Sequence, residues 1–306
     1  MNNTVYHIPA LLPQAIEGLK INPSGIYIDA TFGGGGHSGA IVRNLSQEGH
    51  LYSFDQDIEA VERAFSDERF TIVYSNFRFM SNFMRYYGHT GDVDGILADL
   101  GVSFHHFDDP DRGFSFRWEG KLDMRMNQKS DKDAASVVNG YTEEQLSNIF
   151  YLYGELKQSR KVAAAIVKAR DVKPVETIEQ LLAVVKPIIN VKQEKKELAQ
   201  IFQALRIEVN DELTALKQFL GQSIKTLKPG GRLVVITYHS LEDRLVKNFM
   251  KTGNIEGKVT KDFYGRNLSP LKLITSKPIV PDEEEIEANP RSRSAKMRIA
   301  ELVVTE

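Results

Sequence analysis

Short apolar runs alternate with longer amphipathic segments over residues 25–99 of the chain. The runs are rich in β-branched and aromatic residues, as buried strands are, and they cover residues 25–30, 50–55, 70–74 and 93–99. Helix-length segments separate them, at about 37–45, 58–65 and 77–87. Strands that alternate with helices are typical of βαβ units. The sequence therefore predicts an α/β fold with a mostly parallel sheet, and ligands bind such sheets where the strands end.

The alternation stops after Gly101. Residues 104–133 contain many aromatic and charged residues without a clear period, and helical signals follow. Thr142 and Thr177 each stand three residues before a glutamine, which is the spacing of a capping box. We therefore expect a helical domain at 105–205, inserted into a core made of residues 1–104 and 206–306. We assign substrate recognition to this inserted domain.

The C-terminal part of the chain supplies the rest of the predicted core. We expect one long helix at about 198–227, which the Lys-Pro-Gly-Gly turn at 228–231 ends. Residues 232–238 form a buried strand, and Ser240 begins a Ser-Leu-Glu-Asp pattern that is typical of a helix start. Two further runs resemble strands, at 271–275 and 297–304. The acidic stretch at 281–289 is expected to be disordered.

Composition narrows the class of protein. The 306 residues are 42% hydrophobic and 26% charged, which is typical of a globular protein. There is no cysteine, so disulfides, thiolate metal sites and thiol nucleophiles are excluded, in keeping with a cytoplasmic protein. We expect neither a signal peptide nor a membrane partner, because no long apolar run is present. The net charge of −2 means that nucleic-acid binding would rest on local patches. The oligomeric state stays open, a dimer included.

Four consecutive glycines at 33–36 connect the first predicted strand to its helix. Without Cβ atoms, the backbone can approach a ligand closely, and the start of the helix offers N–H groups to an anion. Gly34, Gly36 and Gly39 also satisfy the G-x-G-x-x-G pattern. Asp55 ends the second strand, where an acid can accept hydrogen bonds from a ribose. These features predict a nucleoside-cofactor site, and the alternative is a tight turn beside a surface carboxylate.

Asp29 favours one cofactor over another. It stands at the end of the first strand, directly before the glycines, where its charge would repel a pyrophosphate and attract an ammonium group. S-adenosylmethionine (SAM) carries an amino group and a sulfonium. The sequence therefore favours SAM over a dinucleotide.

Several long runs of the chain resemble the RsmH (MraW) family. They include GIYIDATFGGGGHSG at 25–39, DGILADLGVS at 94–103, RGFSFRWEGKLDMRM at 112–126 and LKPGGRLVVITYHSLEDR at 227–244. The family methylates N4 of a cytidine in the decoding centre of 16S ribosomal RNA. The resemblance implies a Rossmann-like, SAM-dependent methyltransferase core, with 16S rRNA in the small (30S) ribosomal subunit as partner. A nucleotide-dependent oxidoreductase and a non-catalytic ribosome assembly factor are the alternatives.

The resemblance also implies which residues bind the cofactor. The residues expected to contact SAM are Gly35, Gly36, His37, Asp55, Phe77, Asp99 and His106. Among them, Asp55 would hold the ribose and Phe77 would lie against the adenine. His106 stands where the family has a glutamine, and we expect it to keep that contact.

The chemistry of the cytosine amine points to two candidate catalytic residues. This amine is a poor nucleophile, because its lone pair is conjugated with the ring. Asp99 ends the fourth strand, where it could accept the N–H bond and then the proton; alternatively it orients the methionine end of SAM. His239 follows the last central strand and could touch the base or a phosphate, and the alternative is packing beside the cap at Ser240. No metal is expected, since methyl transfer does not need one.

Two groups of residues are candidates for RNA contact. Aromatic residues alternate with Arg112 and Arg117 between residues 104 and 118, which would suit stacking on unpaired bases, and core packing is the alternative. The second group is basic and consists of Arg291, Arg293, Lys296 and Arg298. Asp123 could be catalytic or could pair with Arg125, and we favour the ion pair.

Overall fold

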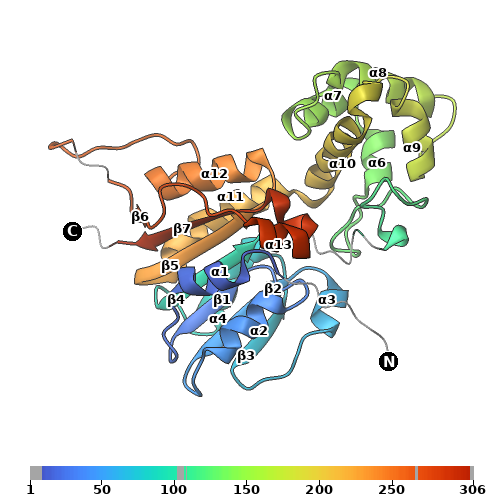
Figure 1. Cartoon of the computed structure of the whole chain (residues 1–306). Helices are drawn as coiled ribbons and strands as arrows, with labels where there is room; N and C mark the ends of the chain where they lie inside the picture. Colours follow the sequence, from blue (N-terminus) through green and yellow to red (C-terminus); the bar gives the residue numbers. More distant parts are fainter. Residues whose placement is uncertain (1–8, 102–106, 108, 266–267, 304–306) are drawn as a thin grey trace. The chain divides into compact units, whose positions relative to one another are not determined.

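The computed structural model describes residues 9–101, 107, 109–265 and 268–303 (Figure 1). The chain divides into two compact units, one made of Met1–Gly101 with Thr214–Glu306 and the other of Val102–Leu213. The second boundary therefore lies at 213, not at 205 as expected. The reason is that helix α10 (Glu194–Asn210) buries its apolar side in the core of the second unit.

A seven-stranded sheet forms the first unit, in the order β3-β2-β1-β4-β5-β7-β6. Its parallel strands are β1 (Ile26–Asp29), β2 (His50–Asp55), β3 (Phe70–Tyr74), β4 (Val93–Asp99) and β5 (Leu227–Thr237). Its antiparallel strands are β7 (Lys296–Leu302) and the edge strand β6 (Leu271–Leu273). The predicted fold class, a Rossmann-like α/β core with a mostly parallel sheet, is confirmed.

Helices cover both faces of this sheet (Figure 1). One face packs against α1 (Leu12–Leu19) and α2 (Gly36–Arg43), and the other against α4 (Met80–Tyr86), α11 (Glu212–Thr226) and α12 (Ser240–Thr252). Adjacent residues such as Tyr27 and Ile28 enter different cores, because side chains alternate across a strand. The short helix α3 (Ile58–Glu62) and the 3-10 turn η1 (Phe77–Phe79) follow β2 and β3.

The second unit is helical. Its elements are η2 (Pro110–Arg112), α6 (Ala134–Gly140), α7 (Glu143–Leu152), α8 (Ser159–Arg170), α9 (Ile178–Val185), η3 (Val191–Gln193) and α10. The capping boxes at Thr142 and Thr177 are confirmed, since each hydroxyl accepts the N–H of the glutamine three residues later. Across the described part of the chain, no helix is both long enough and apolar enough to cross a membrane.

Two elements of the C-terminal half differ from expectation. The single long helix breaks at Asp211, whose left-handed backbone (φ 50°) separates α10 from α11. The acidic stretch is ordered as α13 (Glu283–Ala288), followed by η4 (Pro290–Ser294). Asp282 caps α13, and the carboxylate of Glu285 accepts the N–H of Leu11 at 2.8 Å. Acidic side chains stabilise the start of a helix because its N–H groups carry partial positive charge, so a high acid content did not indicate disorder here.

Candidate active site

Three aspartates end neighbouring strands at one edge of the sheet, and the register decides which of them a ligand can reach. Asp29 of β1 pairs with Ser53 on β2 and Leu97 on β4. Asp55 and Asp99 therefore lie two residues further along their strands than Asp29 does. Consistent with this, Asp29 is fully buried, whereas the side chain of Asp99 is 19% exposed.

The glycine turn leads from β1 into α2, and the physical reason for having a glycine differs among its four positions. A Cβ on Gly34 would meet no described atom within 4 Å, and one on Gly33 would only reach the carbonyl oxygen of Thr31 at 4.0 Å. A side chain on Gly35 would strike the ring of Phe32 at 2.8 Å, at a φ of 75°. On Gly36, a Cβ would strike Pro9 at 2.3 Å. Folding thus explains Gly35 and Gly36, and the left-handed backbone of Gly33 (φ 52°) favours glycine as well. Only Gly34 has neither constraint, and both Gly33 and Gly34 leave open space above the backbone.

Asp55 fastens the glycine turn to the end of β2. One carboxylate oxygen accepts the N–H of Gly33 at 2.8 Å, and the other accepts the N–H of Asp57 at 2.9 Å. A carboxylate oxygen can accept more than one hydrogen bond, so this geometry leaves Asp55 able to accept ribose hydroxyls as well. It stands beside the open glycines, as a ribose-binding acid would have to.

Asp29 stabilises the glycine turn through hydrogen bonds to residues at both of its ends. Its carboxylate accepts the hydroxyl of Ser38 at 2.6 Å and the backbone N–H of Thr31 at 3.1 Å. Burial raises the pKa of the Asp29 carboxyl to about 6, although His37 and the Ser38 hydrogen bond oppose the shift. Asp29 is fully buried, so its predicted attraction for the ammonium of SAM would not act through direct contact in this arrangement. It positions the start of α2 instead.

Asp99 is a partly exposed acid that contacts both ends of the turn, through Thr31 and His37. Its backbone N–H donates to the hydroxyl of Thr31 at 2.7 Å, and its carboxylate lies 3.7 Å from Nδ1 of His37. Burial raises its pKa, and His37 and a hydrogen bond from the Tyr238 hydroxyl act in the opposite direction. A raised pKa makes a carboxylate a better proton acceptor.

Tyr238 was missed by the sequence analysis. It follows β5, and its hydroxyl bonds to Asp99 while its backbone N–H donates to Glu242 at 2.9 Å. Burial raises the pKa of this phenol well above its usual range, so it stays a neutral donor. Its place at the end of a predicted central strand was the available signal, but its partner lies 139 residues earlier in the chain.

Two of the predicted cofactor residues are held from within the first unit. His37 is buried, and its Nε2 lies 3.1 Å from the carbonyl oxygen of Ala10. Phe77 is partly buried, and one edge of its ring packs against Phe219 with ring centroids 5.4 Å apart. The contacts of His37 and Phe77 with SAM stay predictions. His106 lies outside the described residues.

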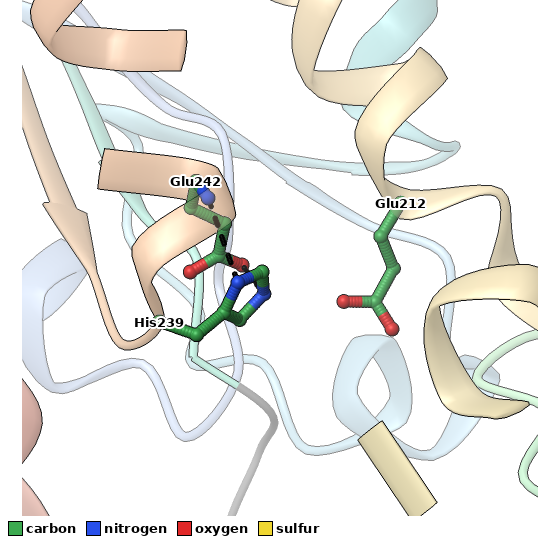
Figure 2. Close-up of side chains that lie close together, drawn as sticks. All are labelled: Glu212, His239 and Glu242. Atoms are coloured by element: carbon green, nitrogen blue, oxygen red, sulfur yellow. Dashed lines mark hydrogen bonds and ion pairs between the residues drawn. The ribbon is translucent and has the colours of Figure 1, made fainter. Parts of the chain in front are cut away.

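His239 caps helix α12, which corrects the expected cap at Ser240. Its Nδ1 accepts the N–H of Glu242 at a long 3.5 Å, and its Nε2 lies 3.1 Å from a carboxylate oxygen of the same residue (Figure 2). The structure therefore gives His239 a role at the start of the helix. A contact with the base or a phosphate stays a prediction.

The candidate RNA contacts divide into buried and exposed residues. In the second unit, Phe114 is buried and Phe116 packs against Phe202, whereas Trp118 is 49% exposed. Arg112 is buried as well, and its guanidinium donates to two backbone carbonyls. Core packing thus explains most of this group.

Two charged residues that were candidates for catalysis or RNA contact form ion pairs. Asp123 pairs with Arg125 through two hydrogen bonds of 2.9 and 2.7 Å, which confirms the favoured interpretation. Arg298 does not belong to the exposed basic group, because it is buried and bonds Asp243. Arg291, Arg293 and Lys296 are exposed.

Sequence comparison shows to which known family the chain belongs. The profile of the MraW methylase family matches residues 4–303. The chain belongs to the MraW methylase family. A relative from Parabacteroides distasonis, called ribosomal RNA small subunit methyltransferase H, is 62% identical over 301 residues, covering 98% of this chain and 99% of its own. Relatives with the same name from Phocaeicola vulgatus and Bacteroides fragilis are 64% and 60% identical, each covering 97% of this chain and 97% and 98% of their own.

The cofactor of this MraW methylase is SAM. The residues at the strand edge fit it on physical grounds. The space above Gly33 and Gly34 would be narrowed by any Cβ, and Asp55 stands beside it with hydrogen-bonding capacity for a ribose. Membership in a methylase family also removes the oxidoreductase alternative.

Proposed function

We propose that this chain transfers a methyl group from SAM directly to N4 of a cytidine in the decoding centre of 16S rRNA, within the small ribosomal subunit. The observation that carries the proposal is the near full-length identity of 62–64% to proteins called ribosomal RNA small subunit methyltransferase H. A ribosomal substrate would place the activity in the cytoplasm.

The glycine turn, the acid Asp55 and the ring of Phe77 would hold the cofactor. Backbone groups at Gly35, Gly36 and His37 would contact it, Asp55 would bind the ribose and Phe77 would lie against the adenine. SAM would supply a methyl group bonded to a sulfonium, and the sulfur would keep the electron pair of the S–C bond that breaks. Because the reaction is a direct displacement, alignment of acceptor and donor does most of the catalytic work.

Asp99 would act on the acceptor. Its carboxylate accepts a hydrogen bond from the N4 amine, which localises the nitrogen lone pair for attack on the methyl carbon. As the N–C bond forms and the S–C bond breaks, N4 becomes positively charged and releases a proton to Asp99. The raised pKa of Asp99 supports this role, and Tyr238 fixes the direction of the carboxylate. His239 is a further candidate for a contact with the base.

The RNA must present its cytidine outside the helical stack to reach this edge. We propose that the second unit takes part in recognition, because Trp118 and its neighbour Arg117 are exposed and suited to stacking on an unpaired base. Arg291, Arg293 and Lys296 are candidates for phosphate contacts.

Mass spectrometry of rRNA from a strain that lacks the gene tests the proposal. We expect the N4-methyl signal at the decoding cytidine to be absent from the deletion strain and to return with the wild-type gene. The Asp99→Ala variant should not restore it if the protein acts by catalysis. An unchanged N4-methyl signal in the deletion strain would remove the proposed substrate.

A further inference from the structure

Residues 258–265 of the first unit carry two aromatic side chains almost entirely in water. They lie in the long connection between α12 and β6, which extends away from the sheet at the left of Figure 1. Phe263 is 98% exposed and Tyr264 is 81% exposed. We call this segment the aromatic arm. Large apolar groups held in solvent commonly mark a binding surface, because leaving them exposed forgoes the gain from burial.

The arm has a defined shape that presents the two rings. The carboxylate of Asp262 accepts the N–H of Tyr264 at 2.8 Å, and its carbonyl oxygen accepts the N–H of Gly265 at 3.1 Å. Gly265 completes the turn with a φ of 81°, which favours glycine. The rings of Phe263 and Tyr264 meet edge to face, with centroids 5.7 Å apart. The turn thus fixes both rings at the tip of the arm.

Hydrogen bonds also fix the base of the arm. Asn254, just after α12, binds Lys258 twice, accepting its N–H at 2.9 Å and donating to its carbonyl oxygen at 2.6 Å. Further along, Leu268 donates its N–H to the carbonyl oxygen of Thr260 at 2.9 Å, which closes the two sides of the arm on each other. These hydrogen bonds therefore brace the segment that carries the two rings.

The charge around the rings is positive, although the whole chain has a net charge of −2. Residues 251–277 contain six Lys and Arg and only two acids, Glu256 and Asp262. Lys258 and Lys261 are exposed on the arm itself, while the carboxylate of Asp262 already accepts a backbone hydrogen bond in the turn. Lysines beside exposed aromatic rings are the combination that binds single-stranded nucleic acid, with phosphates on the cations and bases on the rings.

We propose that the aromatic arm binds unpaired nucleotides of the RNA substrate, with bases stacked on Phe263 and Tyr264 and phosphates beside Lys258 and Lys261. This rests on the proposed function, which it deepens by naming a contact outside the methyl-transfer edge. Charge complementarity favours RNA over a protein partner, because the exposed Lys258 and Lys261 stand beside the rings, together with the half-exposed apolar side chains of Val259 and Leu268.

The test is binding of a fluorescent, unstructured 12-nucleotide RNA to the full chain, followed by anisotropy. Stacking on an aromatic ring is strong enough that the Phe263→Ala/Tyr264→Ala double variant should raise the Kd by about tenfold or more. The matched control is Tyr86→Ala on α4, which removes a ring that is 82% exposed elsewhere in the same unit, and it should leave the Kd unchanged.

Salt dependence tests the lysines. Lys258→Ala and Lys261→Ala should each reduce the slope of log Kd against log salt by about 0.7, the value for one phosphate contact on a single strand. Lys217→Ala, an exposed lysine on α11, should leave this slope unchanged.

Each outcome decides the proposal. The role of the arm is overturned if the double variant binds RNA with a Kd within twofold of wild type while its melting temperature and SAM affinity are unchanged. Loss of binding to a protein partner in that variant would not rescue the proposal. The proposed function fails separately: if the wild-type chain needs both rings to bind RNA yet methylates no rRNA, the arm stands and the substrate assignment falls.

Discussion

The hydroxyl of Tyr238 donates a hydrogen bond to the carboxylate of Asp99, and so connects the end of β5 to the end of β4 at the proposed methyl-transfer edge. The two strands are neighbours in the sheet. A buried phenol that stays neutral is a fixed donor, and this donor holds one orientation of the acid while leaving it partly accessible. Tyr238 is thus a positioning residue for Asp99.

Replacing Tyr238 with phenylalanine should change the pH dependence of methyl transfer. The hydrogen bond lowers the pKa of Asp99, so its loss should raise that pKa further. Because Asp99 acts as the carboxylate, the acid limb of the kcat/KM profile should move to higher pH by about one unit, which corresponds to a bond of about 1.4 kcal/mol. Tyr52→Phe, a buried tyrosine in β2, is the control and should not move the limb. An acid limb at the wild-type position would remove the positioning role.

The Asp99→Asn variant separates the two roles considered for this acid. If Asp99 accepts the proton, methyl transfer should slow by about 10²- to 10⁴-fold in single-turnover kinetics, while the SAM Kd measured by calorimetry changes little. The opposite pattern, weak SAM binding with a nearly normal rate at saturating SAM, would show that Asp99 only orients the cofactor.

Two glycine substitutions should have opposite effects. Gly34→Ala adds a methyl group in open space, so the melting temperature should hold while the Kd for SAM rises at least fivefold. Gly36→Ala places its methyl group 2.3 Å from Pro9 and should lower the melting temperature by several degrees. Normal SAM affinity in a folded Gly34→Ala protein would mean that the cofactor does not lie over this peptide group.

Asp29 should make the fold less stable as pH rises. Its pKa is raised to about 6 in the folded chain from an ordinary value of 3.8, so the folded state holds the proton over a range where the unfolded state has lost it. The free energy of unfolding should therefore fall between about pH 4 and 6, by at most about 3 kcal/mol from this group. Urea unfolding of wild type and Asp29→Asn should diverge over this range in favour of the variant. A constant difference between the two proteins would contradict the assignment.

The parallel core could be predicted from the sequence because the residues that favour each strand are close neighbours along the chain. The four runs that end near Ala30, Asp55, Tyr74 and Asp99 are each rich in β-branched or aromatic residues, and all but the run at 70–74 carry an aspartate at or near their end. The glycine turn is equally local, so its place between β1 and α2 could be predicted. The register could not: that Asp29 is buried while Asp99 is reachable depends on which residues of three strands pair.

Features that depend on distant contacts were missed. The break at Asp211 needs a non-glycine residue in a left-handed conformation, which sequence rarely indicates. Helix α1 was not predicted, and its start at Leu11 is held by Glu285, 274 residues away. The hydrogen bond between Tyr238 and Asp99 likewise joins two residues that are far apart in the sequence. Such pairings follow from the fold and not from any pattern within one segment.

The most direct measurement is reconstitution with small ribosomal subunits from a strain that lacks this methylation. The purified chain and SAM with an isotopically labelled methyl group are added, and the nucleosides of the digested 16S rRNA are analysed by mass spectrometry. We predict about one labelled N4-methylcytidine per 16S rRNA, at the decoding centre, and almost none with Asp99→Asn. Label in another nucleoside, or equal labelling by wild type and the variant, would contradict the account.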